Sequence, residues 1–179
     1  MPADMRAGPR LAASFPESAV LGECLVAAGL TVGVAESCTG GLLGAVLTAV
    51  PGASRYVRGG IIAYADAVKV DLLAVDPELI ERVGAVSPEV AAAMAQGVAR
   101  RLGTSLGIAI TGVAGPGAEG TAKPVGLAYV AAWLDGRTEA LELRESGARE
   151  ANRAAAVRAA LTLGLRLAGW RPPAPVATG

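Results

Sequence analysis

The chain has 179 residues, 53% of them hydrophobic and 3% aromatic, and its 16 Lys and Arg residues balance 16 Asp and Glu residues. Such a chain lacks the basic surface and the stacking platforms of nucleic-acid-binding proteins. It also lacks an uncharged apolar run of about 18 residues for a membrane span, a signal-peptide core and enough cysteine for a disulfide framework. We therefore expect a cytoplasmic protein that binds neither nucleic acid nor membrane, with one domain over 14–170 between disordered tails at 1–13 and 171–179.

Hydrophobic periodicity and turn residues predict helices and strands that alternate along this domain. In chain order we expect a helix up to residue 28, a strand from 32, a helix from 42, a strand over 59–64, short helices from 66 and 77, a helix over 88–102, strands over 106–111, 125–134 and 137–144, and a helix over 149–168. This order predicts an α/β fold: a three-layer α/β/α sandwich with a mixed, mostly parallel sheet of about five or six strands.

Capping and turn residues mark several boundaries of these elements. Ser14 stands three residues before a glutamate, which is the spacing of a capping box, and Ser87 precedes a proline at a first helical position. Asp66 is suited to cap the short helix that carries Lys69 in its first turn. The pair at 135–136, Asp-Gly, predicts the tight turn of a hairpin between the last two strands.

The absence of histidine restricts the chemistry of the chain. It excludes Ser-His-Asp and Cys-His nucleophile systems within one chain, as well as zinc sites that need histidine. A general base must then be Lys, Tyr, Asp or Glu. Two residues are lysines, Lys69 and Lys123, against fourteen arginines. Lysine, unlike arginine, can lose its proton.

Residues 32–42 predict a buried strand, a tight turn and the start of a helix. In parallel sheets ligands bind beyond the carboxyl ends of strands, where Ser37, Tyr64 and Thr111 are all expected. Ser37 is a candidate nucleophile, with helix capping as an equally good explanation, and Cys38 is its rival. Backbone N–H groups of this turn would stabilise an oxyanion. These N–H groups belong to Cys38, Thr39, Gly40 and Gly41.

Two further side chains complete a histidine-free arrangement around Ser37. Lys69 is the cation able to act as a base after desolvation, and Tyr64 is placed to relay a proton or hold the lysine. Local sequence alone favours simpler roles: a solvated lysine and a strand aromatic. Asp66 and Asp71 lie nearby and would favour a charged lysine. Glu36 is a candidate base, but a buried hydrogen-bond acceptor is the simpler interpretation.

The glycine-rich loop over 112–124 follows a strand, a position more typical of functional loops than of idle ones. It matches no standard phosphate-binding motif, but its N–H groups and Lys123 could hold a phosphate, as could Arg149 and Arg153 near the start of the last helix. A flexible lid is the alternative for the loop. Surface charge is the alternative for the arginines.

Several of these segments closely resemble motifs of the CinA C-terminal domain family, in the same order, over about residues 17–168. The segments are Ala35–Leu42 (AESCTGGL), Gly59–Tyr64 with Lys69 (GGIIAY), Gly84–Ser87 (GAVS), Thr111–Gly117 (TGVAGPG) and Lys123–Gly126 (KPVG).

The resemblance implies an amidohydrolase that deamidates nicotinamide mononucleotide to nicotinate mononucleotide and ammonia, without metal or cofactor. It implies Ser37 as nucleophile and Tyr64 and Lys69 as its proton-handling partners. It also implies Thr111, Gly112 and Arg149 at the nucleotide substrate. A homodimer is the expectation at the level of the family. The length leaves no room for the nucleotide-hydrolysing domain of full-length CinA proteins, so we expect the stand-alone type.

The chain departs from the family pattern at three places. Ala65-Asp66 stands where Ser-Asn is frequent, Ala118-Glu119 where a Gly-Gly pair is common, and Glu145 where Phe is frequent. These changes leave the three expected catalytic residues intact and bear on substrate preference. The alternative function is a non-catalytic nucleotide-binding module that uses the same glycine-rich loops.

Overall fold

A mixed five-stranded sheet with strand order β2-β1-β3-β4-β5 forms the centre of the computed structural model, which describes residues 9–118 and 120–170. The pairs β1–β2 and β1–β3 are parallel, and β3–β4 and β4–β5 are antiparallel. β4 therefore runs against the other strands, which agrees with the expected mixed, mostly parallel sheet. The strands are β1 (Val32–Glu36), β2 (Val57–Ile62), β3 (Leu106–Gly112), β4 (Leu127–Leu134) and β5 (Arg137–Arg144).

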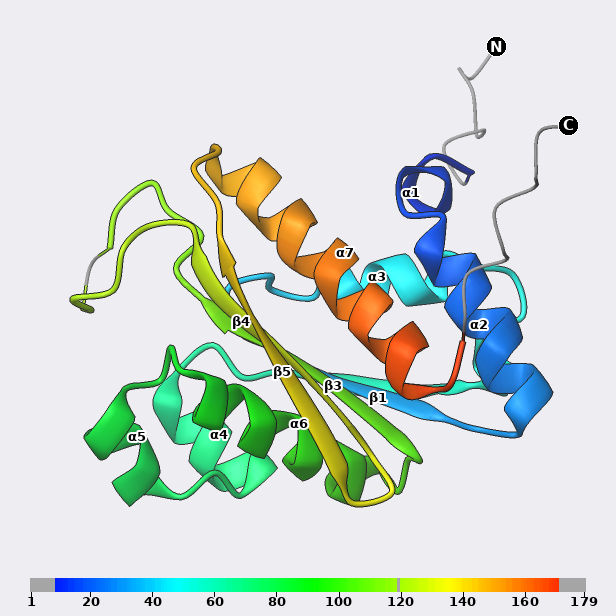
Figure 1. Ribbon diagram of the computed structural model, residues 1–179, viewed down its shortest axis with the longest axis horizontal. Coiled ribbons are helices and arrows are strands. Elements are labelled where there is room, and N and C mark those ends of the chain that lie inside the picture. Colours follow the sequence, from blue (N-terminus) through cyan, green and yellow to red (C-terminus); the bar gives the residue numbers. More distant parts are fainter. Residues whose placement is uncertain (1–8, 119, 171–179) are drawn as a thin grey trace, which may run out of the picture.

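Helices cover both faces of this sheet and complete the predicted three layers (Figure 1). One layer contains α1, α2, α3 and α7, and the other contains α4, α5 and α6. The helices are α1 (Pro9–Ser14), α2 (Glu17–Ala28), α3 (Leu42–Thr48), α4 (Asp66–Leu73), α5 (Pro77–Val83), α6 (Pro88–Leu102) and α7 (Arg149–Leu167), with a short 3₁₀ helix at Ala53–Arg55.

The central strands are buried because both of their faces are covered. Every residue of β1 is buried, as is all of β3 except its last residue. Apolar runs without alternation are typical of such strands. Small residues bring α6 close to its neighbours. A Cβ on Gly97 would collide with the carbonyl oxygen of Leu73, and a Cβ on Gly107 of β3 would collide with the carbonyl oxygen of Ala95. This close packing places α4 and α6 tightly under the sheet.

The predicted helix α6 and the β4–β5 turn are confirmed in detail. The Ser87 hydroxyl accepts a hydrogen bond from the Val90 N–H at 3.3 Å and caps α6. Asp135 and Gly136 both have positive φ, at 48° and 82°, as a tight hairpin turn requires. In these places the local sequence pattern predicts the structure correctly.

Three local expectations are wrong. Residues 9–14 form α1 where a tail was expected, and residues 1–8 and 171–179 of the expected tails lie outside the described residues. Ser14 ends α1, so the N-cap of α2 is Pro16 and the capping box does not form. The N-cap of α4 is Ala65, and Asp66 is the first helical residue, with its carboxylate turned to a lysine instead of the backbone.

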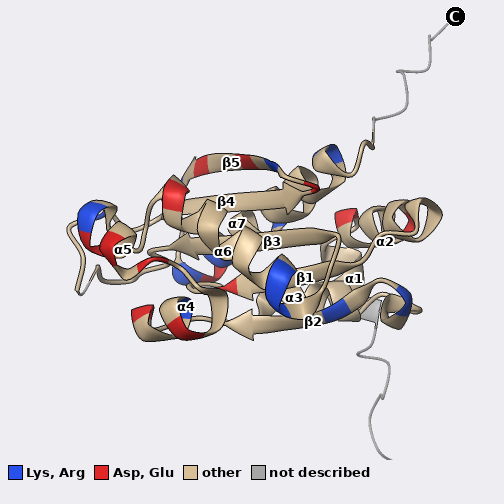
Figure 2. Cartoon of the chain, turned by 90° about the horizontal axis from the view of Figure 1, so that it is seen from below, with Lys and Arg blue, Asp and Glu red and all other residues tan. Residues whose placement is uncertain are grey.

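Charges of both signs are mixed over the surface, and Figure 2 shows the strands in the order β5, β4, β3, β1, β2, with charge colour on the edge strand β5 and none on β3 and β4. Within the described ranges, no helix combines the length and the apolar character needed to cross a bilayer.

Candidate active site

A pocket of about 280 Å³ lies at the carboxyl ends of β1, β2 and β3, the edge where the sequence predicted a site. Its wall comes from the turn after β1, the start of α4, the connection before α6, the glycine-rich loop after β3 and the start of α7. The described residues that line it are Ser37, Cys38, Tyr64, Asp66, Lys69, Ala85, Val86, Thr111, Gly112, Val113, Ala114, Gly115, Gly117, Gly120, Thr121 and Arg149.

The pocket brings together most, but not all, of the residues expected at the site. The expected residues that line it are Ser37, Cys38, Tyr64, Lys69, Thr111, Gly112 and Arg149. The other three, Thr39, Gly40 and Gly41, belong to the same turn but are not among the described residues that line the pocket. Lys123 lines an adjoining pocket of about 220 Å³ that shares Asp66 with the first.

The carboxylate of Glu36 holds the start of α3 and is the hydrogen-bond acceptor that the sequence suggested as the simpler role. It is 2% exposed and accepts from the N–H groups of Gly41, Leu43 and Gly44 at 3.1, 3.0 and 2.8 Å. A carboxylate is well suited to the positive end of a helix. Glu36 is also not among the described residues that line the pocket, so the structure gives it the structural role.

Glu36 also reduces the number of N–H groups left for an oxyanion. The Gly41 N–H donates to Glu36, and the Gly40 N–H donates to the Ser37 carbonyl at 3.0 Å. The Cys38 and Thr39 N–H groups have no backbone acceptor within the described ranges. The expected oxyanion donors at 38–41 therefore narrow to these two.

Arg153 of α7 fixes the same turn from the other side. Its Nε and Nη2 atoms both donate to the Thr39 carbonyl, at 3.2 and 2.6 Å. Its Nη1 lies 3.8 Å from the Glu150 carboxylate. The guanidinium that the sequence offered as a phosphate ligand is thus occupied in holding the turn that carries Ser37.

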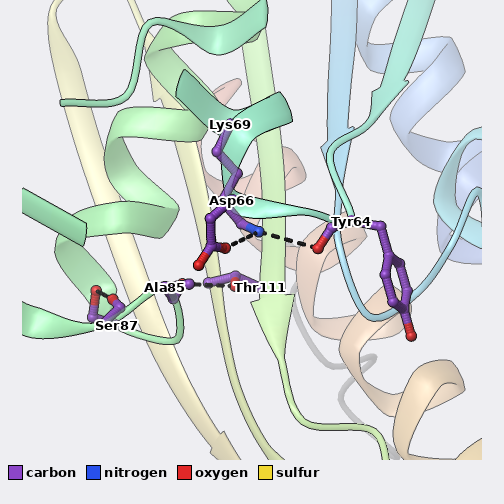
Figure 3. A network of polar contacts seen from close by, with 7 residues as sticks. Tyr64, Asp66, Lys69, Ala85, Ser87 and Thr111 are labelled. Atoms are coloured by element: carbon purple, nitrogen blue, oxygen red, sulfur yellow. Dashed lines mark hydrogen bonds and ion pairs between the residues drawn. The ribbon is translucent and has the colours of Figure 1, made fainter. Parts of the chain in front are cut away.

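Lys69 is buried, contrary to the solvated side chain that its local sequence favoured. It is 1% exposed, and its amine donates to Asp66 Oδ1 at 2.9 Å and to the Tyr64 carbonyl oxygen at 3.4 Å (Figure 3). The Tyr64 ring points away from this amine, and its hydroxyl accepts from Arg149 Nη2 at 3.3 Å. Tyr64 therefore holds Lys69 through its main chain and not through its hydroxyl.

Burial makes Cys38 a poor nucleophile. It raises the pKa of the Cys38 thiol to about 11. The Glu36 charge adds to this effect, while a hydrogen bond from the Cys38 backbone and the charges of Arg149 and Arg153 oppose it. At neutral pH the side chain is a thiol, whereas attack requires the thiolate. Of the two candidate nucleophiles of the turn, Ser37 is the one that does not depend on forming this thiolate.

Contacts from α7 and β3 hold the loops around the pocket. Arg149 Nη1 donates to the Gly115 carbonyl at 2.6 Å, and Asn152 Nδ2 donates to the Ala114 carbonyl at 3.1 Å. The hydrogen bond to Tyr64 also raises the pKa of Arg149, so this side chain is a permanent cation at the pocket. The Thr111 hydroxyl donates to the Ala85 carbonyl at 2.8 Å, which ties the connection before α6 to the end of β3.

The sequence indicated that Asp66 would favour a charged Lys69, and the structure shows the two side chains in contact, three residues apart on one helix face. Sequence reasoning missed the contribution of Ala85 and Val86. The connection before α6 carries no polar side chain at the pocket, and its place depends on the distant Thr111.

Comparisons with known proteins agree with this architecture. A sequence profile of the CinA C-terminal domain matches residues 16–167. A putative competence-damage inducible protein of Desulforamulus reducens is 50% identical over 145 residues, which are 80% of this chain and 35% of that protein. A CinA-like protein of a Synechocystis strain is 59% identical over 113 residues, 63% of this chain and 27% of that protein.

Two solved structures share the fold. A CinA superfamily protein of Escherichia coli superposes with a TM-score of 0.80 at 35% identity and covers 86% of this chain and 90% of its own. One of Klebsiella pneumoniae has a TM-score of 0.83 at 33% identity and covers 88% and 99%. The chain spans about a third of the length of the curated relatives it matches. On the profile match over most of its length, the chain belongs to the CinA C-terminal domain family.

Proposed function

We propose that the protein is an amidohydrolase that converts nicotinamide mononucleotide to nicotinate mononucleotide and ammonia. The observation that carries this proposal is that Ser37 and the buried Lys69 both line one pocket of a chain without histidine. A serine with an amine base is an established alternative to the serine–histidine pair. The close resemblance of the motifs at 35–42 and 59–69 to those of the family supports the amide substrate.

In the first step Ser37 Oγ attacks the carboxamide carbon while Lys69 Nζ accepts the hydroxyl proton. A tetrahedral oxyanion forms, and the Cys38 and Thr39 N–H groups are the donors left to stabilise it. The carbon–nitrogen bond then breaks. Lys69 returns the proton to the departing nitrogen, so ammonia leaves and a nicotinoyl ester of Ser37 remains.

In the second step water hydrolyses this ester. Lys69, neutral again, takes a proton from the water as its oxygen attacks the ester carbon, and then returns the proton to Ser37 Oγ as the ester bond breaks. The products are the nicotinate carboxyl group and the free serine. The two steps together consume one amide and one water, and no redox change or metal is needed.

The rest of the pocket suits a nucleotide. Arg149 supplies a positive charge at the pocket, where it can meet a phosphate while it braces the loop through Gly115. The exposed Tyr64 ring offers an apolar surface beside it, with 59% of the residue accessible. The adjoining pocket lined by Lys123 offers a second cation within the same edge of the sheet.

An ammonia-release assay with nicotinamide mononucleotide tests the proposal. Ser37→Ala should abolish turnover, and Lys69→Met should lower kcat by roughly 10²–10⁴-fold, the usual contribution of a general base. Ser54→Ala, a change at an exposed serine of the 3₁₀ helix, is the matched control and should leave kcat unchanged. Binding of the nucleotide without any release of ammonia by the wild type would instead identify a nucleotide-binding module.

A further inference from the structure

The environment of the Lys69 amine contains an acceptor that the three expected catalytic residues do not account for. Asp66 Oδ1 lies 2.9 Å from Lys69 Nζ, closer than the Tyr64 carbonyl oxygen at 3.4 Å. Figure 3 shows the amine between these two oxygens, with the Tyr64 hydroxyl pointing elsewhere. Asp66 is therefore the nearest partner of the amine within the described residues, and it lies in the same pocket wall.

Two acceptors are enough to fix the direction in which a neutral amine reacts. A neutral lysine amine carries two N–H bonds and one lone pair in a tetrahedral arrangement. When Asp66 and the Tyr64 carbonyl accept both hydrogens, the lone pair occupies the remaining direction. When the amine has gained a proton, that same direction carries the third N–H. The pair of acceptors thus sets one path along which a proton arrives and leaves.

We propose that Asp66 is the positioning residue of this site: its carboxylate orients the Lys69 amine and sets the pH range in which the amine accepts the Ser37 proton. This inference rests on the proposed function and extends it to a residue where the family pattern more often has asparagine. An asparagine oxygen would orient the amine equally well. A carboxylate adds a negative charge that favours the protonated amine.

The other charged or titratable groups around the pocket leave this role to Asp66. From the turn after β1, Glu36 is bonded to three N–H groups of α3, and Cys38 carries a neutral thiol at neutral pH. From α7, Arg149 is bonded to the Gly115 carbonyl and to the Tyr64 hydroxyl. From the glycine-rich loop, Lys123 lines the adjoining pocket.

Three variants separate the orienting effect of Asp66 from the effect of its charge: Asp66→Asn, Asp66→Ala and the control Asp71→Asn. Asp71 is an exposed aspartate of the same helix and is not among the described residues of the pocket. In the ammonia-release assay, Asp66→Asn should keep the wild-type plateau of kcat but move the acid limb of the pH–rate profile down by roughly one pH unit. We expect the low end of the range of pKa shifts for a charge pair because the Asp66 carboxylate is half exposed. Asp71→Asn should leave the profile in place.

Asp66→Ala removes the orientation as well as the charge. It should lower kcat on the order of 10²-fold with KM nearly unchanged, as expected when a reacting group is misplaced. Should Asp66→Ala fail to fold, Asp66→Asn remains the deciding variant. A wild-type pH profile in Asp66→Asn, or a wild-type kcat in Asp66→Ala, would overturn the proposal.

A second readout does not depend on the substrate. The chain has two lysines, so the ¹³Cε resonances of a lysine-labelled sample report Lys69 and Lys123 separately, with Lys123→Arg giving the assignment. In Asp66→Asn the Lys69 resonance should titrate at lower pH than in the wild type, while the Lys123 resonance stays in place. An unmoved Lys69 titration would overturn the inference. If the titration moves but the wild type releases no ammonia, the proposed function fails, and only the effect of Asp66 on the Lys69 amine stands.

Discussion

Replacing Glu36 with glutamine should loosen the turn that carries Ser37. The Glu36 carboxylate is buried, and its Oε2 accepts from Gly41 and Leu43 while its Oε1 accepts from Gly44. A glutamine has one oxygen to offer. If this oxygen accepts from Gly41 and Leu43, the NH₂ group of the glutamine faces the Gly44 N–H. One hydrogen bond is then lost, and the other two are made to a neutral acceptor instead of a charged one.

The size of this effect follows from the bonds affected. A hydrogen bond to a charged group contributes about 1.5–3 kcal/mol, and a buried donor left without a partner costs about 1–3 kcal/mol. We expect Glu36→Gln to lower the free energy of unfolding by about 2–4 kcal/mol, with partial relaxation of the turn taken into account. For a domain of this size that corresponds to a fall in Tm of roughly 5–15 °C.

Urea denaturation followed by circular dichroism measures this change. The control is Glu81→Gln, which removes the same charge from an exposed position of α5 and should change the unfolding free energy by less than about 0.5 kcal/mol. If Glu36→Gln unfolds at the wild-type urea concentration, the three N–H bonds do not hold the turn, and the argument for a fixed Ser37 is refuted.

Three further outcomes are expected. In a variant without the other cysteine, iodoacetamide should alkylate Cys38 slowly at pH 8, because a thiol with a pKa of about 11 is ionised there to roughly one part in 10³. The reaction should accelerate as the pH rises, and fast reaction at pH 8 would contradict the burial of this thiol. Gly126→Ala should destabilise the fold by about 3 kcal/mol or more in urea denaturation, because the φ of Gly126 is 86° and the new Cβ would collide with the Glu145 carbonyl oxygen. A wild-type urea midpoint would mean that the chain before β4 is free to move. The hydrogen bond from Tyr129 holds the pKa of Glu142 below its usual range. The wild type should therefore be more stable than Glu142→Gln at pH 7, and this difference should disappear as the pH falls through the lowered pKa. A difference between the two urea midpoints that does not change with pH would count against this pairing.

The sequence predicted the part of the site that is built from neighbours in the chain. The valine-rich strand, the small residues after it and the helical spacing from Leu42 indicated the turn that presents Ser37. Parallel strand ends then placed Thr111 and the residues after β2 at the same edge, because this follows from topology alone. The strand–turn–helix segment was the most reliable expectation for this reason.

Contacts between distant segments were beyond local reasoning. Lys69 reads locally as a solvated residue of a short helix, yet the packing of α4 against α6 and the sheet buries it. Arg153 looked like a surface charge or a phosphate ligand, but its partner, the Thr39 carbonyl, is 114 residues away. The capping box at Ser14 failed for the opposite reason: its local pattern is correct, but that serine ends the preceding helix.

The central claim is that Ser37 becomes acylated during turnover, and intact-protein mass spectrometry tests it most directly. The enzyme is mixed with nicotinamide mononucleotide and quenched in acid within the first turnovers, and the peptide that carries the added mass is then mapped. We predict the mass of the nicotinate nucleotide acyl group on the peptide that contains Ser37, and no such adduct in Ser37→Ala. Continued release of ammonia by Ser37→Ala, with no adduct on the wild type, would contradict the account.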